Sequence, residues 1–105
     1  VSKKSLKVLV MCNAAMSSSL FAKKIQVKCD EEELNVKTLA ISLSEFEDIW
    51  KDYDILMVTP QAAFKKDYIE GIVNNQRPVY YIDMEQFGKM DVTYVIEYLE
   101  ECLRG

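Results

Sequence analysis

Short apolar runs alternate with segments of helical periodicity along the whole chain, and this alternation limits the fold more than any other feature. The apolar runs predict strands at residues 6–11, 36–41, 54–58 and 79–82. Helical spacing predicts longer helices at about residues 16–33, at 62–73 and from 91 onward, with shorter ones at 42–50 and 84–87. Because the strands are apolar throughout, we expect a parallel sheet that is covered on both faces.

The order of these elements predicts an α/β fold with a single domain over residues 1–105. Right-handed crossovers between parallel strands give a doubly wound four-stranded sheet with helices on both faces. A chain of 105 residues is long enough for one core and too short for two. Ligands of such sheets bind beyond the carboxyl ends of the strands, where Cys12, Thr59 and Asp83 are expected to lie.

The composition of the chain limits which cofactors and partners it is expected to have. The net charge of −4, from 13 basic and 17 acidic residues, disfavours nucleic acid as a partner. No apolar stretch approaches the roughly 20 residues of a membrane-spanning helix, so direct membrane insertion is not expected and the chain is predicted to be cytoplasmic. Three cysteines without close spacing, and no histidine, argue against a zinc site or a disulfide framework. We expect no metal and no cofactor.

Cys12 ends the first apolar run, and a loop of small and hydroxyl-bearing residues follows it before the predicted helix. The free N–H groups and the dipole of a helix N-terminus stabilise an anion, either a thiolate or a phosphate. The chain lacks histidine, so activation of Cys12 has to come from backbone dipoles or from another molecule. From these residues alone, Cys12 is either a nucleophile in a phosphate loop or a small packing residue at a strand end.

Several other sites for phosphate chemistry fail on their spacing. A cysteine phosphatase of the C-x5-R type needs an arginine where this chain has Ser18, and the first arginine is Arg77. A receiver domain needs an aspartate at the end of the third strand, where Thr59 stands. A nucleotide-binding loop of the type GxxxxGK[ST] is absent.

Three segments, at residues 12–20, 59–64 and 81–91, carry motifs that go beyond the Cys12 loop. Together they resemble the enzyme IIB components of the lactose/cellobiose (chitobiose) class of the bacterial phosphoenolpyruvate-dependent sugar phosphotransferase system (PTS). Residues 12–20, C-N-A-A-M-S-S-S-L, are similar to the family pattern C-x-A-G-M-S-T-S-L. Residues 59–64, T-P-Q-A-A-F, are similar to G-P-Q-x-A-Y. The pair Y-I-D at 81–83 and F-G-K-M-D at 87–91 resembles V-I-D followed by Y-G-x-x-D.

This resemblance implies a phosphoryl carrier. Cys12 would accept a phosphoryl group from a phosphohistidine on a IIA partner. It would pass the group to a sugar, such as cellobiose, chitobiose or lactose, held by a membrane IIC partner. The resemblance implies that the phosphate is bound by Asn13, Ala14, Ala15, Met16, Ser17, Ser18 and Ser19. It also implies a docking face that includes Met16, Leu20 and Gln61.

Two positions depart from the family pattern. Ala15 and Thr59 both stand where the family commonly has glycine, a residue that tolerates positive φ. These departures keep open an alternative, a diverged regulatory or non-catalytic module on the same scaffold. Asp83 is expected to order the rim of the site and to take no part in the chemistry.

Overall fold

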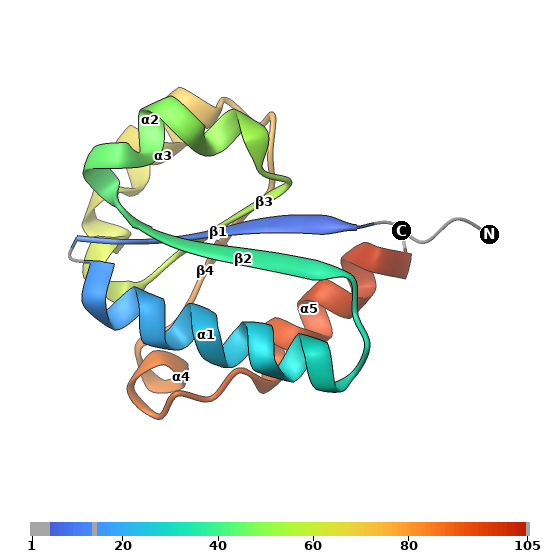
Figure 1. Ribbon diagram of the computed structural model, residues 1–105. Coiled ribbons are helices and arrows are strands. Elements are labelled where there is room, and N and C mark those ends of the chain that lie inside the picture. Colours follow the sequence, from blue (N-terminus) through green and yellow to red (C-terminus); the bar gives the residue numbers. More distant parts are fainter. Residues whose placement is uncertain (1–4, 14, 105) are drawn as a thin grey trace.

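The computed structural model describes residues 5–13 and 15–104, in which four parallel strands form one sheet. The strands are β1 (Leu6–Cys12), β2 (Val36–Ser42), β3 (Ile55–Val58) and β4 (Val79–Tyr81). Their order across the sheet is β2-β1-β3-β4, with β1 paired to both β2 and β3 (Figure 1). The α/β class, the four strands and their parallel pairing agree with the sequence-based prediction.

Helices cover both faces of this sheet, as a doubly wound fold requires. Helices α1, α4 and α5 lie on one face, and α2 and α3 lie on the other (Figure 1). The α-helices are α1 (Ala15–Glu31), α2 (Phe46–Ile49), α3 (Lys66–Val73), α4 (Met84–Gly88) and α5 (Thr93–Arg104). Three 3-10 segments adjoin them, η1 (Leu43–Glu45), η2 (Trp50–Asp52) and η3 (Pro60–Lys65).

The alternation of side chains along β1 divides the core into two halves. Val8 and Val10 pack with α1 and α5, whereas Leu9 and Met11 pack with α2 and α3. All four are fully buried, because β1 has a paired strand on each side and helices on each face. The side chain at each position of β1 and β3 can therefore be assigned to one face of the sheet from its parity.

The buried face of α1 differs from the one that the sequence suggested. Helical spacing in the sequence predicts an apolar face of Leu20, Ile25, Val27 and Leu34. Ile25 is buried as predicted, but Leu20 and Val27 are 61% and 47% exposed. The helix instead buries a stripe one position further round, made of Ser18, Phe21, Ala22, Ile25 and Cys29. On this stripe the Phe21 ring packs against the Phe87 ring, with 5.2 Å between the ring centroids.

The third helix also departs from its predicted form. It begins as the 3-10 segment η3 and becomes α-helical only at Lys66. A 3-10 helix has three residues per turn, so it carries Phe64 away from the face that α3 buries through Ile69 and Val73. Phe64 is therefore 68% exposed. The spacing of Phe64, Tyr68, Ile69 and Ile72 in the sequence predicts instead that all four share one apolar face.

Candidate functional site

The carboxyl ends of the strands bring Cys12 and Thr59 side by side. Cys12 is the last residue of β1, and the N–H group of Thr59 donates to the carbonyl oxygen of Met11 at 3.0 Å. This bond continues the β1–β3 pairing by one residue beyond the partners Met11 and Val58. Asp83 lies on the same edge after β4, with β3 between it and Cys12.

Cys12 lies between the end of a buried strand and the start of the longest helix. The residue is 2% exposed and its thiol is free of any disulfide. Helix α1 begins at Ala15, has 17 residues and carries no acidic residue in its first turn. Its N-terminal dipole thus acts on the neighbourhood of Cys12 without an opposing charge from its own first turn.

The predicted phosphate-binding residues fall at the start of α1. Asn13 is exposed between β1 and α1, Ser18 is fully buried and Ser19 is exposed. Ala15, Met16 and Ser17 belong to the first turn of α1. Ala14, and the side chains of residues 15–17, lie outside what the structure describes.

The alanine at position 15 suits this arrangement. It is the first residue of α1, and alanine is the residue most favourable to a helix. The substitution for the family's glycine therefore falls on a helical position.

The hydroxyl group of Thr59 has surroundings that are not expected from the sequence. The residue is fully buried, and Oγ1 makes no hydrogen bond within the described part of the chain. Leaving a buried hydroxyl unpaired costs about 1–3 kcal/mol. Sequence reasoning placed Thr59 on this edge but assigned it no role, because its burial depends on how β3 packs beside β1.

Asp83 acts as a helix cap, in agreement with the expectation that it orders the rim. Its Oδ1 accepts a hydrogen bond from the backbone N–H of Gln86 at 2.7 Å, and Oδ2 accepts one from Gln86 Nε2 at 2.9 Å. Both carboxylate oxygens are thus engaged in starting α4.

The predicted docking residues are exposed where the structure describes their side chains. Leu20 is 61% exposed on the second turn of α1, and Gln61 is exposed near the start of η3. Both segments begin at the carboxyl edge of the sheet, close to the end of β1 (Figure 1). Phe64 of η3 and Met84 at the start of α4 are further exposed apolar side chains.

The other two cysteines are packing residues. Cys29 is fully buried on α1, and Cys102 packs partly buried against the same core from α5. Burial raises the pKa of Cys29 to about 11, and the charges of Asp30, Glu32 and Glu100 add to the shift. Cys29 therefore remains a neutral thiol at pH 7 and is a poor competitor to Cys12 as a nucleophile.

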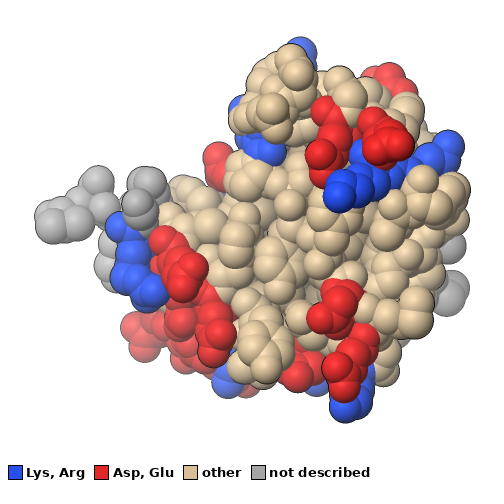
Figure 2. All heavy atoms as spheres, turned by 180° about the vertical axis from the view of Figure 1, so that it is seen from behind, with Lys and Arg blue, Asp and Glu red and all other residues tan. Residues whose placement is uncertain are grey.

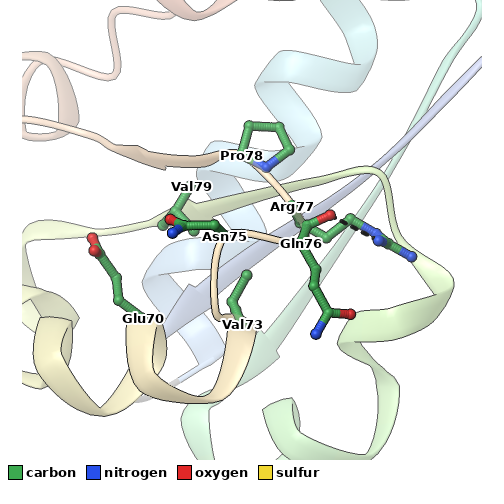
Figure 3. A pocket seen from close by; sticks show the side chains of 7 residues that line it. All are labelled: Glu70, Val73, Asn75, Gln76, Arg77, Pro78 and Val79. Atoms are coloured by element: carbon green, nitrogen blue, oxygen red, sulfur yellow. Dashed lines mark hydrogen bonds between the residues drawn. The ribbon is translucent and has the colours of Figure 1, made fainter.

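An open hollow of about 450 Å³ lies between α3 and the start of β4, at the edge of the sheet opposite Cys12 (Figure 3). Arg77 is on its rim, but its guanidinium is turned to backbone carbonyls. It donates to Tyr53 O at 2.7 Å, to Lys51 O at 3.0 Å and to Gln76 O at 2.9 Å. The first arginine of the chain is thus remote from Cys12, which adds to the case against a C-x5-R phosphatase.

Charged side chains lie around the periphery of one face of the molecule, with a group of acidic ones at lower left (Figure 2). On the face drawn in Figure 2, Lys and Arg lie in small separate groups beside Asp and Glu, and much of the middle is uncharged. Within residues 5–13 and 15–104, no cluster of His, Cys, Asp and Glu could hold a metal ion. No helix in those ranges has the length and apolar character to cross a bilayer.

Solved structures share this fold. The lactose-specific IIB domain of the PTS from Streptococcus pneumoniae superposes with a TM-score of 0.82 at 19% identity, over 93% of this chain and 97% of that one. The cellobiose-specific IIB protein from Borrelia burgdorferi gives a TM-score of 0.77 at 22% identity, over 96% of this chain and 94% of that one.

Comparison of sequences identifies a relative and a family in addition to the shared fold. The chain is 29% identical over 101 residues to the lactose-specific EIICB component of the PTS from Staphylococcus haemolyticus (strain JCSC1435). That alignment covers 90% of this chain but only 17% of the relative. Residues 7–98 match the family described as "PTS system, Lactose/Cellobiose specific IIB subunit". Because that match spans most of its length, the chain belongs to the lactose/cellobiose-specific IIB family of the PTS.

Proposed function

We propose that Cys12 carries a phosphoryl group between two partner proteins during sugar uptake. The observation that supports this most is the position of Cys12, at the carboxyl end of β1 and just before the 17-residue helix α1. The match of residues 7–98 to a family of the phosphotransferase system supports phosphoryl transfer as the reaction of that thiol. A carrier of this kind needs no metal and no cofactor.

The proposed reaction has two displacements. The Cys12 thiolate attacks the phosphorus of a phosphohistidine on a IIA partner, so an S–P bond forms and the N–P bond breaks with its electrons left on the imidazole. A sugar hydroxyl then attacks the same phosphorus, the S–P bond breaks and the thiolate is restored while the hydroxyl proton passes to solvent. The chain contains no histidine, so the donor histidine belongs to the partner.

The start of α1 would bind the group in transit. Backbone N–H groups from Asn13 to Ser18, with the side chains of Asn13 and of the serines at 17–19, would donate to phosphoryl oxygens. Such donors stabilise the charge that spreads over those oxygens during transfer. The absence of an acidic residue in the first turn of α1 supports this role.

The acceptor would be a sugar, such as cellobiose, chitobiose or lactose, held by a membrane IIC partner, with this chain working in the cytoplasm. The name of the Staphylococcus relative, a combined EIICB component, supports a IIC partner, as does the small share of that protein which this chain covers. Neither nucleic acid nor membrane insertion enters this proposal.

Phosphorylation by a complete system tests the proposal. The domain is incubated with phosphoenolpyruvate, the general phosphotransferase proteins and a lactose/cellobiose-type IIA, and its intact mass is followed. We expect a gain of about 80 Da, one phosphoryl group, that is lost in Cys12→Ser and kept in the control Cys102→Ser. No gain in the wild type, with a IIA shown to be phosphorylated, would refute the carrier role.

Docking through Met16, Leu20 and Gln61 is tested separately. Leu20→Ser is expected to slow phosphorylation by IIA, because it removes an apolar side chain that is 61% exposed near the site. The matched control is Leu39→Ser, which alters a 42% exposed leucine on β2, three residues before Ser42 and so roughly 10 Å from the edge. Equal rates for the two variants would exclude Leu20 from the interface.

A regulatory or non-catalytic IIB-like module is the second candidate. It is favoured by the burial of Cys12, which is 2% exposed and therefore poorly accessible to a donor in this structure. The same experiment separates the two candidates, because such a module would bind IIA without gaining mass at Cys12.

A further inference from the structure

The hydroxyl of Thr59 stands out among the buried polar groups of the chain. Thr59 is fully buried, and its Oγ1 has no hydrogen-bond partner within the described residues. Folded proteins pair the large majority of such atoms, so each exception calls for an explanation. The backbone of Thr59 is fully engaged, since its N–H donates to Met11 O at 3.0 Å and its carbonyl accepts from the Ala62 N–H at 2.9 Å.

The register of the sheet sets Thr59 beside Cys12 on one face. Val8 and Val10 face α1, so the next residue of the same parity, Cys12, faces α1 as well. Met57 packs in that same core, and Thr59, with φ −75° and ψ 161°, continues the extended strand by two residues. The two side chains are therefore lateral neighbours on adjacent strands, whose spacing is about 4.8 Å.

We propose that the Thr59 hydroxyl donates a hydrogen bond to a phosphoryl oxygen of the group carried on Cys12. This rests on the proposed function and adds a donor that comes from β3, outside the loop between β1 and α1. No covalent bond to Thr59 forms or breaks, and its proton stays on Oγ1.

The geometry favours the phosphoryl group over the bare thiol as the partner. Oγ1 makes no hydrogen bond to the Cys12 sulfur in this structure. A phosphoryl group places its oxygens two bonds, roughly 3 Å, beyond that sulfur, and a gap of one strand spacing is then within hydrogen-bond reach. A hydroxyl bonded to an anionic oxygen is also a stronger pair than two neutral groups.

The test compares Thr59→Val, which keeps the shape and removes the hydroxyl, with Thr59→Ser, which keeps the hydroxyl. With phosphorylated IIA as donor, we expect Thr59→Val to take up the phosphoryl group about tenfold more slowly, equivalent to about 1.4 kcal/mol. Thr59→Ser should retain most of the wild-type rate. The phosphorus NMR signal of the phosphocysteine should shift in Thr59→Val and stay close to wild type in Thr59→Ser.

Urea denaturation separates this role from a purely structural one, because the two roles predict opposite changes in stability for Thr59→Val. Thr59→Val removes an unpaired hydroxyl, so the unphosphorylated variant should unfold at an equal or higher urea concentration than the wild type. A lower midpoint would show that the hydroxyl serves the fold and would overturn the proposal. Equal slowing by valine and serine would do the same, because packing would then be the cause.

The outcomes separate this inference from the carrier role itself. If the wild type gains a phosphoryl group on Cys12 and Thr59→Val gains it at the same rate with the same phosphorus signal, only the role of Thr59 is refuted. If the wild type gains no phosphoryl group, both the carrier role and the role of Thr59 are refuted.

Discussion

The side-chain amide of Gln26 links α1 to the edge strand β2 through the backbone groups that a neighbouring strand would use. Its Nε2 donates to Val36 O at 2.8 Å, and its Oε1 accepts from the Thr38 backbone N–H at 2.9 Å. These two groups are on β2, which has β1 on one side only, so the side-chain amide occupies hydrogen-bonding sites that an incoming strand would use. A third bond runs from Nε2 to Asp30 Oδ1 at 3.0 Å.

Gln26→Met keeps the length of the side chain and removes this pairing. Each backbone bond contributes about 1 kcal/mol, and a buried group left unpaired costs about 1–3 kcal/mol. Val36 is 1% exposed, so water reaches its surroundings poorly and the larger cost applies there. We expect the free energy of unfolding to fall by roughly 2–4 kcal/mol, a large part of the ~5–15 kcal/mol that holds a typical domain.

Urea denaturation at pH 7 measures this change, with Gln76→Met, on an exposed loop, as the matched control. Gln26→Glu adds a second test, because its carboxylate would face the Val36 carbonyl and the Asp30 carboxylate. That surrounding raises the pKa of the introduced carboxyl on folding, so the penalty should shrink as the pH falls and the group regains a proton to donate. If both Gln26 variants unfold within about 0.5 kcal/mol of the control, the strand-like pairing does not stabilise the fold.

Three further predictions concern single side chains. The pKa of Cys29 rises from 9.0 to about 11 on folding, so its contribution to stability is complete below pH 9 and is lost towards pH 11. Cys29→Ala should therefore flatten the plot of unfolding free energy against pH between these two values. Asp83→Ala should lower the unfolding free energy by about 1 kcal/mol through loss of the α4 cap, measured against the exposed Asp48→Ala. Arg77→Ala should cost about 2 kcal/mol, and Arg77→Lys should restore less than half, because lysine cannot bond the Tyr53 and Lys51 carbonyls with one planar group.

The sheet, and the edge of it at which Cys12 lies, were predictable because they depend on local patterns. Each strand is an apolar run, and the parity of β1 follows once helices are expected on both faces. The position of Cys12 at a strand end, and of Asp83 at a helix start, needs only the boundaries of these elements. The candidate nucleophile and its edge of the sheet were therefore accessible from the sequence.

Contacts between elements were not predictable in this way. The buried stripe of α1 includes Phe21, whose ring packs on Phe87, a residue far from it in the chain. In the sequence nothing distinguishes Gln26 from a surface glutamine, because its hydrogen bonds depend on the packing of α1 beside β2. The unpaired hydroxyl of Thr59 appears only when β3 is set in register with β1.

Locating the phosphoryl group on the chain tests the central claim most directly. The domain, phosphorylated through IIA, is cleaved under mild conditions and its peptides are analysed by mass spectrometry, which separates Cys12 from Cys29 and Cys102. We expect the phosphoryl group on Cys12 and on neither of the others, in keeping with its place between β1 and α1. A phosphoryl group on any other residue, or on none while IIA is phosphorylated, would contradict the account.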